Sequence, residues 1–177
     1  RCSTLHKDYT SWGGDEMGIN IGGAVHHEVA KTGVNQATGG LDSFTRLTVD
    51  ALYNNAGLSL FGAAYFEVQE AVNGGVESDP FGFLAQAGYN IDDKWEPFVR
   101  YEFIDADVAG VDEVNVITAG VNYYLKKHSA KFTIDGVFVL DPLDATNLVV
   151  SDSLGLQGDA ADEDGQFALR AQFQLLF

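Results

Sequence analysis

The chain has 177 residues, a formal net charge of −16 and a sequence pI near 4.3. Such an acidic chain is not expected to bind nucleic acid, since a phosphate backbone attracts basic surfaces. Twenty glycines against three prolines, with 12% aromatic residues, favour paired β-structure, and the lack of any run of about 18 apolar residues excludes a transmembrane helix.

The first 14 residues show no hydrophobic periodicity and are interpreted as a lead-in segment, 1–14. Within it, Trp12-Gly13-Gly14 indicates a turn that carries an aromatic residue at an interface. Cys2 is the only cysteine, so no internal disulfide can form. No apolar leader precedes Cys2, which argues against a lipid anchor there.

From residue 15 onward, apolar and polar residues alternate in eight segments. Period-two alternation is typical of a β-strand with one apolar and one polar face. The segments are separated by stretches rich in Gly, Asn, Asp, Thr or Lys, which are typical of turns and loops. The predicted strands are 15–28, 41–53, 58–69, 81–91, 95–104, 113–125, 130–140 and 165–177.

The connections between these strands alternate in length. Long connections are expected at about 29–40, 73–80, 105–112 and 141–164, and short turns at 54–57, 92–94 and 126–129. All long connections therefore fall at one end of the sheet, as in outer-membrane barrels with long extracellular loops and short periplasmic turns. We interpret 15–177 as an all-β, antiparallel transmembrane β-barrel in a bacterial outer membrane, with 1–14 on the periplasmic side. The mean hydropathy of −0.04 agrees with one lipid face and one wet face.

The last predicted strand is apolar at every odd position from residue 167 onward. It resembles the C-terminal signal strand of bacterial outer-membrane barrels, which implies recognition by the outer-membrane assembly machinery. The alternative is an ordinary amphipathic strand. The residues that carry the resemblance are Phe167, Leu169, Phe173, Leu175 and Phe177.

Four aromatic residues stand on predicted apolar faces beside the short turns: Tyr53, Tyr89, Trp95 and Tyr123. Tyrosine and tryptophan at such positions are typical of the aromatic girdle at a membrane interface. The alternative is aromatic residues scattered through ordinary strands.

The stretch from Phe98 to Asp141 includes FVRYEFIDAD and VITAGVNYYLKKHSAKFTIDGVFVLDP. It resembles the C-terminal part of the phosphate-selective porin O and P family, in which a Gly-x-Asn-Tyr-Tyr-Leu strand leads through a His/Lys-containing hairpin into the next strand. The matching residues are Gly120, Asn122, Tyr123, Tyr124, Leu125 and then His128 to Lys131.

This resemblance implies that the chain is the C-terminal half of a porin of about sixteen strands, often a homotrimer, that lets small hydrophilic solutes diffuse through a water-filled channel. Because export requires a signal that the chain does not show, we expect Arg1 to be a processed or truncated start. The competing interpretation is a complete eight-stranded barrel, whose interior would be filled by side chains.

The predicted polar faces carry a set of charged residues that would line such a channel. Seven acidic residues, Glu16 and Glu28 among them, stand against four basic ones. The phosphate selectivity of the family is therefore not carried over, and a weakly cation-preferring or unselective pore is expected. The alternative is that these charges pair across strands, as Arg46 would with a neighbour such as Asp50. The predicted pore-lining residues are Arg46, Asp50, Glu67, Glu96, Arg100, Glu102, Lys131, Asp135 and Arg170.

Other chemistry is not indicated. His26-His27-Glu28 has metal-ligand residue types, but adjacent strand residues point to opposite faces. The acidic runs at 105–113 and 159–164 lack the glycine-punctuated spacing of a calcium loop, so solvated loops are favoured over loose cation binding near lipopolysaccharide.

We therefore expect no catalytic residues, metal or cofactor, and outer-membrane lipid and lipopolysaccharide as the surroundings. Besides the porin, two alternatives stay open: a small filled outer-membrane barrel with a structural or adhesive role, and a soluble β-barrel binder.

Overall fold

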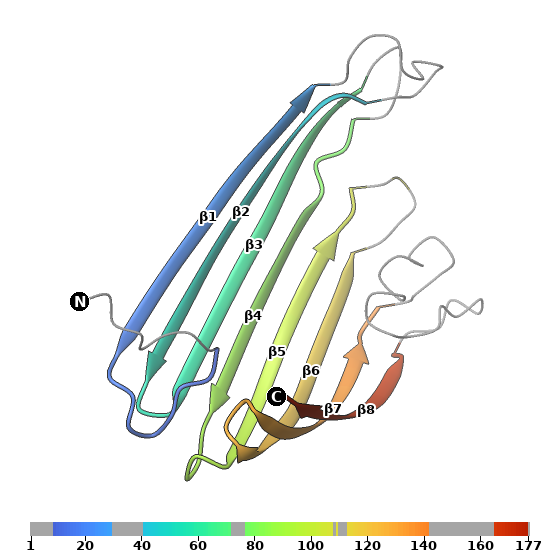
Figure 1. The fold of residues 1–177 in the computed structure, drawn as a ribbon. Helices are drawn as coiled ribbons and strands as arrows, with labels where there is room; N and C mark the ends of the chain where they lie inside the picture. Colours follow the sequence, from blue (N-terminus) through green and yellow to red (C-terminus); the bar gives the residue numbers. More distant parts are fainter. Residues whose placement is uncertain are drawn as a thin grey trace.

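The computed structural model describes residues 9–29, 41–71, 77–107, 109, 113–141 and 165–176. In these residues the chain forms one antiparallel sheet of eight strands and no helix (Figure 1). No helix in them is long and apolar enough to cross a bilayer. The strands are β1 Gly18–Val29, β2 Leu41–Asn55, β3 Leu58–Ala71, β4 Phe81–Tyr89, β5 Trp95–Asp105, β6 Val114–Lys126, β7 Ala130–Val139 and β8 Phe167–Leu175.

The all-β, antiparallel, eight-stranded prediction is confirmed. The largest difference at a strand end is at β1, which was predicted to begin at residue 15 and begins at Gly18. Residues 30–40, 72–76, 108, 110–112 and 142–164, which include parts of all four predicted long connections, lie outside the described residues, as does Phe177.

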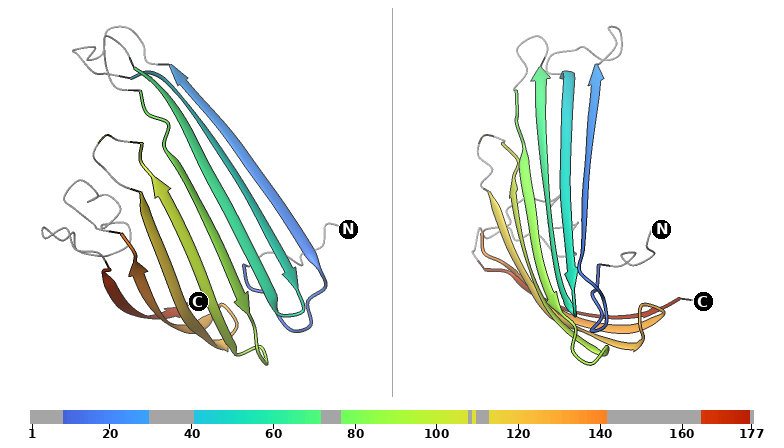
Figure 2. Two further views of the ribbon diagram at one scale, coloured as in Figure 1. Left: turned by 180° about the vertical axis from the view of Figure 1, so that it is seen from behind. Right: turned by 90° about the vertical axis from the view of Figure 1, so that its left-hand side faces the viewer.

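The sheet is an open meander in which each strand pairs with the next along the chain. Among the described residues, β1 pairs only with β2 and β8 only with β7, so the sheet does not close into a barrel. The sheet is strongly curved: β7 and β8 sweep across the lower end while β1, β2 and β3 stay extended (Figure 2).

The turn between β2 and β3 shows how the local sequence sets the register. Ala56 and Gly57 both have positive φ, 45° and 95°, as in the primed turns that match the twist of a hairpin. A Cβ at Gly57 would lie 2.9 Å from the carbonyl oxygen of Asn90, so this position requires glycine. The resulting register places Arg46 directly opposite Glu67.

Directly paired residues share a face of the sheet, so the register assigns every strand residue to one of two faces. One paired row crosses all eight strands with apolar residues or glycine: Ile19, Tyr53, Leu60, Ala87, Val99, Ala119, Gly136 and Leu169. We call this the outer face. The row beside it belongs to the opposite, inner face and contains Asn54, Ser59, Asp135 and Arg170.

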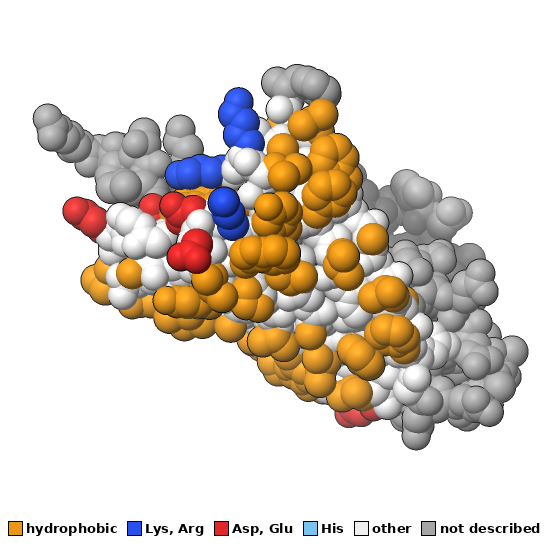
Figure 3. Space-filling model, turned by 90° about the horizontal axis from the view of Figure 1, so that it is seen from below, with side chains coloured by type: hydrophobic (Ala, Val, Ile, Leu, Met, Phe, Trp, Pro, Cys, Tyr) orange, Lys and Arg blue, Asp and Glu red, His pale blue; other side chains and the backbone are white. Residues whose placement is uncertain are grey.

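Burial on the two faces is the reverse of that in a water-soluble sheet protein. On the outer face, Leu169 is 72% exposed, Phe173 53% and Phe138 45%, whereas Glu67 and Asp135 on the inner face are buried. A view from the end with the short turns shows hydrophobic side chains over much of the surface, with most charged side chains in one area (Figure 3). The large apolar residues are therefore not shielded in a dry centre.

The inner face is not polar throughout, contrary to the expectation of a continuous wet face. Val114, Val116, Val137 and Val139 lie there and are almost completely buried, with Ile104 and Ala168 packed against them. This cluster occupies the β6 and β7 ends far from the short turns. It supplies the apolar core of this part of the sheet.

Candidate functional site

All nine predicted pore-lining residues lie on the inner face, because each pairs with, or stands two residues from, another inner-face residue. Five of them belong to β5 and β7 and follow the same alternation: Glu96, Arg100, Glu102, Lys131 and Asp135. The structure therefore brings together charges that lie far apart in the sequence.

Glu67 is the centre of the densest polar cluster on the inner face. Arg46 donates to it twice, from Nε at 2.6 Å and from Nη2 at 3.3 Å. Gln69 Nε2 donates at 2.8 Å, and the Tyr65 hydroxyl donates to the same carboxylate. The Arg46 guanidinium also lies 4.3 Å from the ring centroid of Phe44. The paired fork of an arginine with a carboxylate is a strong, directional contact.

The other two inner-face arginines also have carboxylate neighbours. Arg170 Nε donates to Asp135 Oδ1 at 2.7 Å. Arg100 Nε lies 3.1 Å from Glu102 Oε2, within ion-pair distance although the angle does not meet that of a hydrogen bond. The expected pairing of charges across strands thus occurs for Arg46 and Arg170, but Arg46 pairs with Glu67 on β3 and not with a neighbour on its own strand.

Asp50 and Glu96 are the inner-face carboxylates without a basic partner among the described residues. The Asp50 carboxylate lies beside Gly22, where a Cβ would be 2.5 Å from its Oδ2, and it is exposed. Glu96 is buried and accepts hydrogen bonds from Asn122 Nδ2 at 2.9 Å and from the Tyr124 hydroxyl. With the three inner-face arginines beside carboxylates, Asp50 and Glu96 stand against one lysine of the predicted lining, Lys131, so the surplus charge of this lining is negative.

On the outer face, the four predicted interface aromatics lie near the short-turn end. Trp95 pairs directly with Tyr123, and their ring centroids are 4.5 Å apart. Tyr53 and Tyr89 belong to the same face of β2 and β4. Four of the predicted signal residues, Phe167, Leu169, Phe173 and Leu175, are exposed on this face as well.

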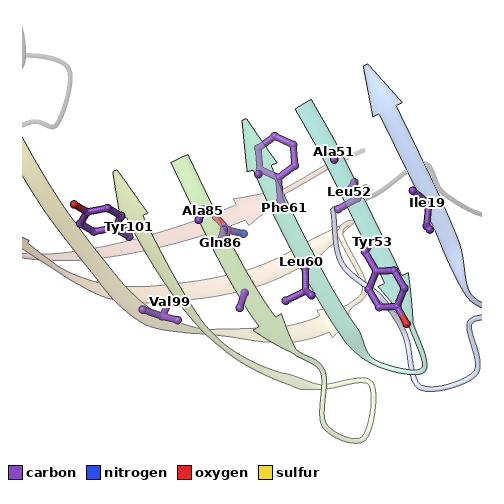
Figure 4. A pocket seen from close by; sticks show the side chains of 12 residues that line it. Ile19, Ala51, Leu52, Tyr53, Leu60, Phe61, Ala85, Gln86, Val99 and Tyr101 are labelled. Carbon is purple, nitrogen blue, oxygen red and sulfur yellow. The ribbon is translucent and has the colours of Figure 1, made fainter. Parts of the chain in front are cut away.

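A shallow groove of about 560 Å³ runs across β1 to β5 on the outer face. Its lining includes the small residues Ala51, Gly62, Ala85 and Ala87, and also Tyr53. The side chains of the adjacent residues Leu60 and Phe61 project from opposite sides of the sheet (Figure 4). No charged side chain lines the groove.

A segment that sequence reasoning did not assign to the site lies on the inner face. Tyr9–Asp15, which we call the N-terminal strap, crosses the short-turn end of the sheet before β1 begins. Trp12 was expected at an interface but is only 7% exposed, because its ring packs on Tyr124 and His128 at 4.9 and 5.6 Å between centroids. The segment has no hydrophobic periodicity, so its large aromatic residue Trp12 was the one sequence signal that it packs against the sheet.

The described residues contain no group of three or more His, Cys, Asp or Glu side chains placed to hold a metal ion. His26 Nε2 lies 3.5 Å from Glu28 Oε2, whereas His27 Nδ1 contacts Thr45 Oγ1 at 2.9 Å on the other face. The two histidines therefore do not converge.

Comparison with known protein families gives no matching family model, and a search of curated proteins gives no match. The features that describe this chain are therefore those of its own structure: a curved antiparallel sheet with an exposed apolar outer face and an inner face that carries the charged residues.

Proposed function

We propose that this chain forms part of the wall of an outer-membrane porin, a β-barrel that lets small hydrophilic solutes and ions diffuse through a water-filled channel. The observation that carries the proposal is the exposed apolar outer face across eight strands. Contiguous apolar surface of this extent marks a protein or membrane contact. A bilayer contact suits all eight strands at once, whereas a soluble binder would turn this face inward.

The unpaired edges of β1 and β8 support a larger barrel. In hydrocarbon an unpaired backbone group costs several kcal/mol, so a spanning sheet has to be closed. The eight strands curve but do not meet, which favours further strands between β1 and β8 over a small filled barrel. This agrees with the resemblance to the C-terminal half of the phosphate-selective porin O and P family, which stays a prediction, as do the homotrimer and the role of the terminal strand in assembly.

The inner-face charges support a preference for cations. Each of the three inner-face arginines in the described residues lies beside a carboxylate. Asp50, which is exposed, and Glu96 have no basic partner among the described residues and outnumber the one lysine of the predicted lining, Lys131. Channel selectivity follows the unbalanced charge of the lining, and here that balance is negative. A phosphate-selective channel would instead need an excess of free basic side chains in its lining.

The reversal potential of single channels in a salt gradient tests this function. The full-length protein is inserted into a planar bilayer with a KCl gradient, and its folded state is checked by heat-modifiable gel mobility. We expect discrete channels with potassium more permeant than chloride. A clear preference for chloride would contradict the assigned selectivity, and the absence of channels from folded protein would contradict the porin itself.

A further inference from the structure

The N-terminal strap is attached to all three short turns of the sheet. Ser11 Oγ accepts a hydrogen bond from the backbone N–H of Gly57 at 3.1 Å, in the β2–β3 turn. The backbone N–H of Gly13 donates to Asp93 Oδ1 at 3.0 Å, in the β4–β5 turn. The Lys127 ammonium of the β6–β7 turn lies 4.8 Å from the centroid of the Trp12 ring.

The strap reaches across the inner face as well as along the turns. Tyr9 makes an edge-to-face contact with Phe61 on β3, with 5.0 Å between ring centroids. The next residue, Thr10, has its Oγ1 2.9 Å from the Tyr124 hydroxyl on β6 and donates to Glu96 Oε2 on β5 at 3.3 Å. Neighbouring strap residues therefore bind strands that are not neighbours in the sheet.

The middle of the strap, Thr10 to Trp12, is as buried as a protein core, whereas Tyr9, Gly13 and Gly14 are exposed. Thr10 is 6% exposed and Ser11 is fully buried, and the Glu96 carboxylate beneath them is 4% exposed. A carboxylate buried to this degree needs its hydrogen bonds satisfied, and the strap supplies one of the donors. The docked strap thus withdraws from water one of the two carboxylates on the inner face that have no basic partner among the described residues.

We propose that the N-terminal strap is an internal constriction of the channel at its short-turn mouth, which narrows the passage and shields Glu96. The inference rests on the proposed porin function and goes beyond it, because it assigns the size limit and part of the selectivity to a segment outside the strands. Undocking the strap widens the mouth and adds a free negative charge to the lining.

The chain has two tryptophans, which provide a matched pair of variants. Trp12→Ala removes the main anchor of the strap, whereas Trp95→Ala removes an equal side chain that is 49% exposed on the outer face. In single-channel recordings of the full-length protein we expect a higher conductance and a reversal potential shifted further toward cations for Trp12→Ala. Trp95→Ala is expected to match the parent in both.

Strap docking is measured separately, without a channel assay. In a Cys2→Ser background, Ser11→Cys is treated with a charged, water-soluble thiol reagent in detergent. We expect slow labelling, faster labelling when Trp12→Ala is added, and no change when Trp95→Ala is added. If Trp12→Ala lacks the folded mobility, Thr10→Val takes its place, since it removes the hydrogen bond to Glu96 and keeps the size of the side chain.

The possible results separate the two proposals. Fast labelling of Ser11→Cys alone would overturn the docked strap. Fast labelling only after Trp12→Ala, with conductance and selectivity equal to the parent, would overturn the constriction while leaving the porin intact. Folded protein that forms no channels in any variant would overturn the porin and the constriction with it.

Discussion

Substitution of Ile134 by arginine separates a lipid-facing sheet from a water-facing one. Ile134 lies near the middle of β7 on the outer face, is 52% exposed, and pairs with Val121 and Ala171. Arginine on the lipid face of a transmembrane barrel costs roughly 2–4 kcal/mol near the bilayer midplane. A half-exposed residue facing water tolerates the same change within about 0.5 kcal/mol.

The matched control is Gln172→Arg. Gln172 pairs with Thr133, the neighbour of Ile134 along β7, and is exposed on the inner face. The same charge is thus added at almost the same height on the opposite side of the sheet. Facing a hydrated lumen, it is expected to change the free energy of unfolding by no more than about 0.5 kcal/mol.

The assay is reversible denaturant unfolding of the full-length protein in lipid vesicles, followed by tryptophan fluorescence. The expected result is a loss of roughly 2–4 kcal/mol in the free energy of unfolding for Ile134→Arg, with Gln172→Arg close to the parent. Equal, small effects of both variants would refute the assignment of the outer face to lipid. A large loss of stability for Gln172→Arg alone would mean that the inner face contacts lipid and the outer face contacts water.

Two further predictions concern the inner face. Arg170→Gln leaves Asp135 without its basic partner, so we expect the reversal potential in a KCl gradient to move toward cations. Lys126→Gln removes an equal charge at the end of β6, beside a short turn, and is expected to have little effect. Equal reversal potentials of the two variants would contradict the pairing of Arg170 with Asp135. Gly120→Ala places a Cβ 2.5 Å from a backbone carbonyl oxygen of β7, so denaturant titration is expected to show a loss of about 1–3 kcal/mol from overpacking. Gly62→Ala, where the nearest atom is 3.8 Å away, is expected to be nearly neutral, and equal stabilities of the two variants would argue against this packing.

The eight strands could be predicted because period-two alternation is a local property of the sequence. Each strand of the sheet has an apolar face, and the turn residues between the strands are equally local, as at Ala56-Gly57. The inner-face position of the charges follows from the same alternation. The partner of Arg46 could not be predicted in this way, because it depends on the register that the turn imposes between β2 and β3.

Two features, the buried valines of the inner face and the docked N-terminal strap, could not be predicted from the sequence, for different physical reasons. Val114 and Val116 alternate with Asn115 and Ile117, so both faces of this part of β6 carry apolar residues and the pattern cannot tell which side is buried. The strap has no periodicity at all, and its burial arises from contacts with residues about 45 to 115 positions away along the chain, among them the Thr10–Tyr124 hydrogen bond. Tertiary contacts of this kind leave no local signal.

Quenching of tryptophan fluorescence by brominated lipids tests most directly whether the outer face contacts the bilayer. Within these 177 residues, Trp12→Phe leaves Trp95 as the single tryptophan and Trp95→Phe leaves Trp12, so the fluorescence of each variant reports on one face of the sheet. In vesicles of brominated phospholipid, we predict strong quenching of Trp95 and little quenching of Trp12. An unquenched Trp95 in folded protein, or a chain that stays monodisperse in buffer without detergent, would contradict the account.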